Sequence, residues 1–160
     1  TFDAAGAGNR TLPFVRTRLD AASGRPLNAA TAYVDLSVVY GESVAKSRVL
    51  RHPRFPALLL YGTRPGAPPA GGGDQGGVPA VEDMYLPTVA NVVAAHGDAA
   101  RGVLGVENAA RTVAEDALFA CGDDRCNGNP HLAMMHTLWL REHNRRALAL
   151  GEAAAAAGGG

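Results

Sequence analysis

The most regular pattern of apolar and polar positions lies in residues 119–150. Between Pro130 and Leu150 no further proline or glycine interrupts the chain, so this segment can form one helix of roughly 30 Å at about 1.5 Å per residue. Apolar residues recur along it on one broad face, which predicts a helix in the interior of the protein. The members of this apolar face are Leu132, Met135, Leu138, Trp139 and Leu140.

The start of this helix is marked by the dipeptide Asn129-Pro130, at the end of a polar turn that spans residues 122–129. An asparagine side chain can accept a backbone N–H that has no partner in the first turn, and the fixed φ of proline suits the first helical position. Glu142 and Arg146 lie one helical turn apart, in the order that favours an ion pair. We therefore expect a polar turn that leads into one long helix.

Shorter elements are expected upstream of this turn. Residues 29–40 contain enough apolar side chains to pack, and Gly41 ends that segment. Residues 42–52 have the pattern of a short helix, which Pro53 ends. Residues 54–62 form either a short strand or an apolar loop, because a brief apolar run does not distinguish the two.

The remaining segments carry weaker patterns. One helix is expected around residues 87–95 and another over residues 107–118, whereas residues 1–26 lack a sustained period and are expected to be an extended loop. Two low-complexity segments, 64–79 and the Ala/Gly-rich 151–160, cannot bury enough apolar surface to offset the entropy of ordering them. We expect the first to be a mobile insertion and the second to be a tail with nothing to fold around.

Composition limits the fold and the partners. With 160 residues and 47% hydrophobic content the chain can bury a single core, while 20 glycines and 10 prolines favour long irregular loops. Together with the predicted helices this indicates a mainly α fold with little or no β, in one domain or part of one. The formal net charge is zero, which gives no electrostatic reason to expect nucleic acid or an acidic membrane surface as a partner.

Three further features of the sequence concern location and compositional bias. No apolar run reaches the length of a membrane span, so no transmembrane segment is expected. The chain begins at Thr1 without a start methionine, so any targeting segment has been removed or was not included. Lys46 is the only lysine, a bias in composition that carries little functional information.

The two cysteines, Cys121 and Cys126, lie five positions apart across the polar turn. No cysteine or histidine near them has the spacing of a zinc site, so they form either a local disulfide or two buried thiols. Residues 9–11, Asn-Arg-Thr, match a glycosylation acceptor, which matters only in an exported chain. This pattern favours an extracellular protein or one of the secretory pathway.

Arg125 stands in the polar turn, directly before the long helix. Two carboxylates, Asp123 and Asp124, precede it, and small residues follow it, so another group can come close. One interpretation is a cation that takes part in chemistry. The other is a solvated loop arginine that pairs with one of the two aspartates.

Two segments carry a resemblance to a known family. Residues 122–147, GDDRCNGNPHLAMMHTLWLREHNRRA, resemble the segment of the animal-type haem peroxidases (the peroxidase–cyclooxygenase superfamily) that runs Gly-Asp-x-Arg, a short polar spacer and a helix with Leu-Arg-Glu-His-Asn. Residues 27–41, LNAATAYVDLSVVYG, resemble the family's calcium-binding stretch, Thr-x-aromatic-x-Asp-x-Ser followed by Val-Tyr-Gly. Both motifs stand in the family's order, and the rest of the chain matches loosely.

The resemblance implies that residues 1–150 are an internal part of one haem-peroxidase-like helical domain, whose remainder is then a partner of this chain. It implies an enzyme that reduces hydrogen peroxide and oxidises a small-molecule donor, with haem (b-type or partly covalent) and Ca²⁺ as cofactors. Arg125 matches the family's catalytic, haem-side arginine. Many members carry a glutamate three residues later that forms an ester to haem, and Gly128 stands at that position here.

The calcium ligands implied by the resemblance are Thr31, Tyr33, Asp35 and Ser37. These residues alternate, so a non-helical backbone places hydroxyl, carboxylate and main-chain carbonyl oxygens on one side, and such hard oxygens suit Ca²⁺. Tyr33 would contribute its carbonyl. Spacing alone favours a different interpretation, a half-buried strand whose small polar face points outward.

The family's distal and proximal histidines have no match in this chain, and the motif of residues 141–144 implies that His143 is an interior structural histidine. The parent protein is then an enzyme, while this chain alone is expected to be inactive and to hold no haem. The alternatives are a non-catalytic structural or interaction module and a relative that oxygenates fatty acids. The five histidines are His52, His96, His131, His136 and His143.

Overall fold

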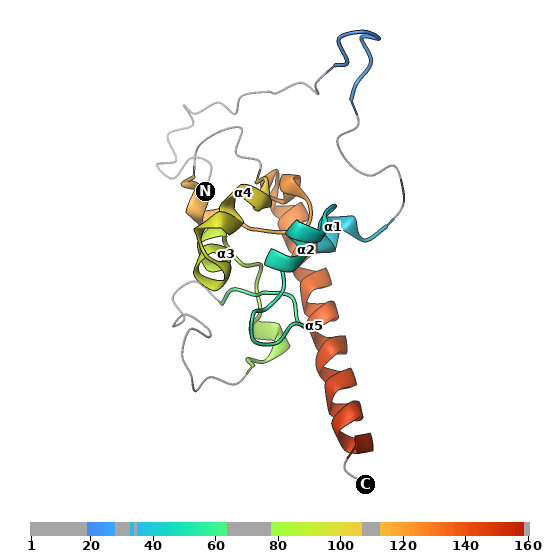
Figure 1. The fold of residues 1–160 in the computed structure, drawn as a ribbon, viewed down its shortest axis with the longest axis vertical. Coiled ribbons are helices and arrows are strands. Elements are labelled where there is room, and N and C mark those ends of the chain that lie inside the picture. The colour runs from blue at the N-terminus through green and yellow to red at the C-terminus, as the bar shows by residue number, and fades with distance from the viewer. Residues whose placement is uncertain (1–18, 28–32, 34, 64–77, 107–112, 159–160) are drawn as a thin grey trace.

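The computed structural model describes residues 19–27, 33, 35–63, 78–106 and 113–158, and over this part the chain is mainly helical (Figure 1). Extended structure among the described residues consists of isolated β-bridges, such as Arg51 with Leu59 and Gly62 with Tyr85. The predicted fold class, mainly α with little or no β, is therefore confirmed. The α-helices are α1 (Ser37–Tyr40), α2 (Val44–Val49), α3 (Val89–His96), α4 (Arg101–Leu104) and α5 (Pro130–Gly158), and the 3₁₀-helices are η1 (Val81–Asp83), η2 (Asp98–Ala100), η3 (Glu115–Ala117) and η4 (Asp124–Asn127).

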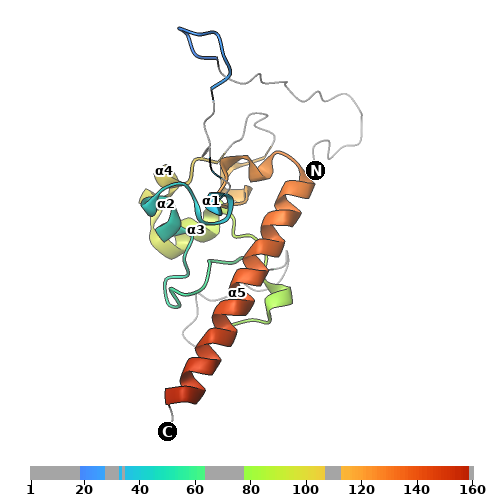
Figure 2. The same cartoon turned by 90° about the vertical axis from the view of Figure 1, so that its right-hand side faces the viewer.

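The long helix α5 forms one side of the molecule, and its C-terminal end extends past the shorter helices in both views (Figures 1 and 2). Its start is as predicted, because the Asn129 side chain accepts a hydrogen bond from the Leu132 N–H at 2.9 Å. The predicted ion pair between Glu142 and Arg146 is also formed. No described helix is both long and apolar enough to cross a membrane.

Two predictions for this helix are wrong. The helix does not end at Leu150 but continues to Gly158 as an exposed helix, because alanine has the highest helix propensity and needs no packing partner to continue an existing helix. Nor is its apolar face interior to this chain. Of that face only Leu140 is buried, since the described segments pack against one side of α5. The others are exposed to between 39% and 56%: Leu132, Met135, Leu138 and Trp139.

The buried side chains form two clusters, and the loop of residues 54–62 contributes to both. Leu59 faces the cluster that includes Leu140 of α5, and Leu60 faces the cluster around α3 and α4. The loop is anchored by backbone hydrogen bonds, from Leu60 N to Leu50 O at 2.8 Å and from Gly62 N to Tyr85 O at 2.9 Å. Of the two alternatives for this segment, the structure shows an apolar loop with isolated bridges.

The loop is fixed to α5 by one buried amide. Asn144, which is fully buried, accepts a hydrogen bond from the Leu59 N–H at 2.8 Å and donates one to the Leu59 carbonyl at 3.1 Å. Its amide group also contacts the Met84 sulfur at 3.2 Å. A side chain thus satisfies both backbone groups of a buried loop residue, as a neighbouring strand would.

The other helix predictions have mixed outcomes. The helix expected at residues 42–52 is present as the shorter α2, and the one expected near residues 87–95 is α3, which begins with a capping box between Thr88 and Asn91. Of the helix expected at 107–118, residues 107–112 lie outside the described part, and the rest holds only the short turn η3, so there the prediction is wrong. Most of the expected N-terminal loop and of the low-complexity insertion also lies outside the described residues.

Candidate functional site

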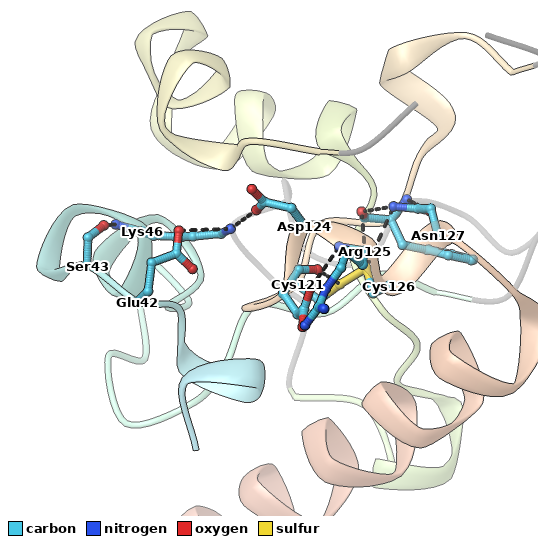
Figure 3. Close-up of polar contacts among 10 residues, drawn as sticks. Glu42, Ser43, Lys46, Cys121, Asp124, Arg125, Cys126 and Asn127 are labelled. Carbon is cyan, nitrogen blue, oxygen red and sulfur yellow. Dashed lines mark hydrogen bonds and ion pairs between the residues drawn. A yellow bond between two sulfur atoms is a disulfide. The ribbon is translucent and has the colours of Figure 1, made fainter. Parts of the chain in front are cut away.

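The candidate site is built on residues 119–129, which we call the arginine turn (Figure 3). The chain enters it beside the start of α3, where Ala120 N donates to Pro87 O at 2.8 Å. The side chain of Asn127 then bonds both backbone groups of Phe119, accepting from its N–H at 2.9 Å and donating to its carbonyl at 2.8 Å. The two ends of the turn are thereby tied together before α5 begins.

A disulfide between Cys121 and Cys126 closes the turn a second time, with the two Cα atoms 6.7 Å apart. The sequence left a disulfide and two buried thiols as alternatives, and the structure shows the disulfide. Both cysteines are buried. Because the closed loop spans a sequence separation of five, the chain-entropy model assigns it about 2 kcal/mol of stabilisation.

Arg125 lies in η4, and its guanidinium turns back onto Asp123. The Asp123 carboxylate accepts from Arg125 Nε at 2.9 Å and from Nη2 at 2.6 Å, and it also accepts from the Arg125 backbone N–H at 2.9 Å. The pairing with an aspartate that the sequence offered as one interpretation is therefore present. Even so, 61% of the arginine side chain stays exposed, against 16% for Asp123, so the guanidinium can still be approached from solvent.

These contacts change the acidity of Asp123. The hydrogen bonds from Arg125 hold the pKa of this carboxyl at about 2, below its ordinary value of 3.8, although burial acts in the opposite direction. His136 of α5 is near enough to contribute to the same shift. Burial lowers the pKa of His136, and Asp123 partly offsets that effect.

The second aspartate has another partner. Asp124 pairs with Lys46 of α2 (Figure 3). Sequence reasoning missed this contact, since the only signal was that Lys46 is the single lysine.

Gly122 makes a second close contact between the arginine turn and the rest of the fold. A Cβ at this position would come within 2.5 Å of the Ser37 carbonyl and 2.6 Å of the Val38 carbonyl. Only glycine fits there, so the arginine turn lies directly on the backbone of α1.

The proposed calcium ligands are placed only in part. Thr31 lies outside the described residues, and Tyr33 is 82% exposed. The Asp35 carboxylate accepts from the Ser37 N–H at 2.9 Å, and Ser37 is the first residue of α1. The alternation that the sequence suggested therefore stops before Ser37, because the local carboxylate bond favours the start of a helix. Among the described residues no group of three or more His, Cys, Asp or Glu side chains could hold a metal.

His143 is partly buried, and both ring nitrogens have hydrogen-bond partners. Nδ1 lies 2.9 Å from the Tyr40 hydroxyl, and Nε2 lies 2.9 Å from the Ala57 carbonyl. Burial lowers the pKa of this histidine. The structural role expected of His143 agrees with these contacts, which join α5 to α1 and to the loop of residues 54–62.

A family model described as animal haem peroxidase matches residues 1–157. The chain therefore belongs to the animal haem peroxidase family, as the two motifs indicated.

Individual relatives agree with the family. The probable oxidoreductase PXDNL of Homo sapiens is 34% identical over 149 residues, which cover 86% of this chain and 8% of that protein. Peroxidase of Drosophila melanogaster is 33% identical, with 89% and 18% covered, and thyroid peroxidase of Homo sapiens is 31% identical, with 90% and 15% covered. The chain thus spans less than a fifth of each of these relatives. No solved structure matches it.

The disulfide is tested by peptide mapping. Trypsin cleaves after Arg111, Arg125 and Arg141, so it cuts inside the closed loop and yields peptides 112–125 and 126–141, each with one cysteine. We expect mass spectrometry to show one linked species without reduction and two separate peptides after reduction. The variant Cys126→Ser should give separate peptides in both conditions. Alkylation of both cysteines in the unreduced, unmodified chain would contradict the disulfide.

The pairing of Arg125 with Asp123 is tested by titration. Because the folded pKa of Asp123 is below the unfolded value, the pair stabilises the turn above about pH 4, and this contribution is lost as the pH falls toward 2. We expect Arg125→Gln to raise the pKa of Asp123 toward its ordinary value in a carbon-13 NMR titration. The control Arg145→Gln should raise the pKa of Glu142 and leave Asp123 unchanged. An unmodified Asp123 that titrates near 3.8 would show that the pair does not form in solution.

Proposed function

We propose that this chain is an internal part of a haem peroxidase that reduces hydrogen peroxide and oxidises a small-molecule donor. The observation that supports this most directly is Arg125, exposed in a closed turn at the start of α5 and oriented by two hydrogen bonds from its guanidinium to Asp123. An arginine donates through a planar fork that stays charged at any physiological pH, which suits the polarisation of a peroxide bond. Membership of the family supplies the reaction class.

In this mechanism each residue has a separate role. Haem supplies the redox chemistry of iron when it is bound. Arg125 donates hydrogen bonds to peroxide and stabilises the negative charge that develops as the O–O bond breaks. Asp123 keeps the guanidinium in one orientation, so little reorganisation is needed during the reaction.

The iron ligand and the proton-shuttling histidine come, on this proposal, from the remainder of the domain. Three of the histidines use ring nitrogens for structural hydrogen bonds: His52 accepts from the backbone at residues 54 and 55, His96 bonds the Arg51 carbonyl, and His143 bonds Tyr40 and Ala57. The disulfide in the arginine turn supports an exported protein, since such bonds persist in oxidising compartments.

Gly128 distinguishes this chain from many members of the family. Without a side chain it cannot form the ester to haem that the family's glutamate forms, so we propose haem without that link. Its backbone, with φ −64° and ψ −31°, is helical and suits any residue. An added Cβ would lie 3.0 Å from the Arg125 carbonyl, a tight contact that requires a shift of a few tenths of an ångström.

The role of Arg125 is tested in the haem-loaded parent protein. We expect Arg125→Lys to slow the reaction with hydrogen peroxide by about a hundredfold to a thousandfold, because a point charge replaces an oriented fork. Gly128→Ala is the matched control in the same turn and should react almost as fast as the unmodified protein. Stopped-flow spectroscopy measures both rates. Full reactivity of Arg125→Lys, or haem esterified to any of residues 126–129 after acid–acetone extraction, would refute the assignment.

We also propose that the parent protein binds Ca²⁺ at the stretch of Thr31, Tyr33, Asp35 and Ser37. The donors of this set are hard oxygens. Two of the four residues, Asp35 and Ser37, line an open depression that Glu42 also lines. One carboxylate in the stretch is too few for a tight site. Further ligands would have to come from the remainder of the domain.

The calcium proposal is tested by thermal unfolding of the parent protein at low and high Ca²⁺. A ligand that binds only the folded state raises the melting temperature, so the unmodified protein should melt higher with calcium. Asp35→Ala removes the only carboxylate of the stretch and should abolish most of that increase, whereas Asp98→Ala, at an exposed site elsewhere, should retain it. A melting temperature of the unmodified protein that does not respond to calcium would rule the site out.

A further inference from the structure

Lys46 is the most enclosed charged side chain among the described residues, with 1% of its surface exposed. Its ammonium group pairs with the carboxylate of Asp124 in η4 and lies 3.7 Å from the carboxylate of Glu42, one turn earlier along the chain (Figure 3). A lysine is almost never fully buried unless it is paired, because the desolvation of its charge is costly. The ion pair with Asp124 is therefore a specific feature of this fold.

Two glycines make room for this pair. Gly41, with φ +88°, lies against the aliphatic part of Lys46, and a Cβ there would come within 2.9 Å of the lysine Cγ. Gly105, with φ +50° at the end of α4, lies against Asp124, and a Cβ there would come within 2.7 Å of Oδ2. The pair thus lies between the end of α1 and the end of α4, and neither glycine can be replaced without a clash or backbone strain.

The position of Asp124 determines which part of the arginine turn the ion pair with Lys46 restrains. The disulfide and the Asn127 hydrogen bonds hold the two ends of the arginine turn, but neither holds its middle. Asp124 is in the middle and directly precedes Arg125, so an anchor on Asp124 fixes the backbone from which the guanidinium extends. The two adjacent aspartates then have different tasks, since Asp123 bonds the guanidinium and the N–H of Arg125 within the turn, whereas Asp124 ties the turn to α2.

We infer that Lys46 is a positioning residue for Arg125, which acts from α2 through its ion pair with Asp124. This inference rests on the proposed peroxidase function, because positioning matters for the reaction only if Arg125 meets peroxide. A reacting group misplaced by about 1 Å can cost roughly a hundredfold in rate. Lys46 itself touches neither peroxide nor haem in this scheme.

The experiment replaces Lys46 with methionine, which keeps the length of the side chain and removes its charge. In the haem-loaded parent protein we expect Lys46→Met to slow the reaction with peroxide by about tenfold to a hundredfold and to leave the KM for the donor unchanged. In the 160-residue chain we expect faster amide exchange across residues 119–129 and a broadened NMR signal of the Arg125 Nε–H. Lys46→Arg, which keeps the charge, should lose less, and Arg48→Met, on the exposed side of α2, should change neither measurement.

A double variant separates positioning from general destabilisation. If the pair acts as a unit, Lys46→Met with Asp124→Asn should be no slower than Lys46→Met alone, because the second change removes a contact that is already lost. Additive losses, or a Lys46→Met protein with normal exchange and a normal peroxide rate, would overturn the inference. If Lys46→Met does not fold, the single variant Asp124→Asn replaces it, because the Asp124 side chain is 44% exposed and its change should be tolerated. A selective loss of the rate with peroxide then supports the inference. An unchanged rate overturns it.

The two proposals can fail separately. If the unmodified parent protein binds haem but does not react with peroxide, while exchange in residues 119–129 still depends on Lys46, the peroxidase function is refuted and the anchoring by Lys46 stands. If the unmodified protein reacts and the Lys46 variants match it, the function stands and the positioning role is refuted.

Discussion

The described fold depends on one buried amide. Asn144 satisfies the N–H and the carbonyl of Leu59, and so fixes the loop of residues 54–62 to α5 without a strand beside it. Both hydrophobic clusters meet at this loop, because Leu59 belongs to one cluster and Leu60 to the other. An unsatisfied buried backbone group costs about 1 to 3 kcal/mol, so the loss of this amide would weaken both clusters at their junction.

The arginine turn shows how a short irregular segment becomes rigid without regular structure. Local bonds close it at the disulfide and at Asn127, and contacts from distant segments place it on the rest of the fold through Gly122 and Lys46. Each of these contacts restrains a different part of the turn. The side chain of Arg125 therefore stays exposed while the turn that carries it is restrained on both sides.

Features that depend on contacts between sequence neighbours could be predicted from the sequence, whereas contacts between distant residues could not. The start of α5 at Asn129 depends on neighbours in sequence and matches the prediction. The pairing of Arg125 with an aspartate is also local, and it is one of the two interpretations that the sequence allows. The contacts of Lys46 with Asp124 and of Asn144 with Leu59 join residues 78 and 85 positions apart, so no local pattern could indicate them. The helix α5 continues past its predicted end at Leu150 because alanine has a high helix propensity even in a segment of low complexity.

The enclosure of Lys46 has a practical consequence for anyone who handles this protein. As the only lysine, it carries the only side-chain amine in the chain, and that amine is closed to solvent in the folded state. Amine-directed dyes, crosslinkers and acylating reagents therefore find no lysine on the surface of this segment. The same amine becomes reactive when α2 separates from the arginine turn. The rate of its acylation would therefore report how often that separation occurs.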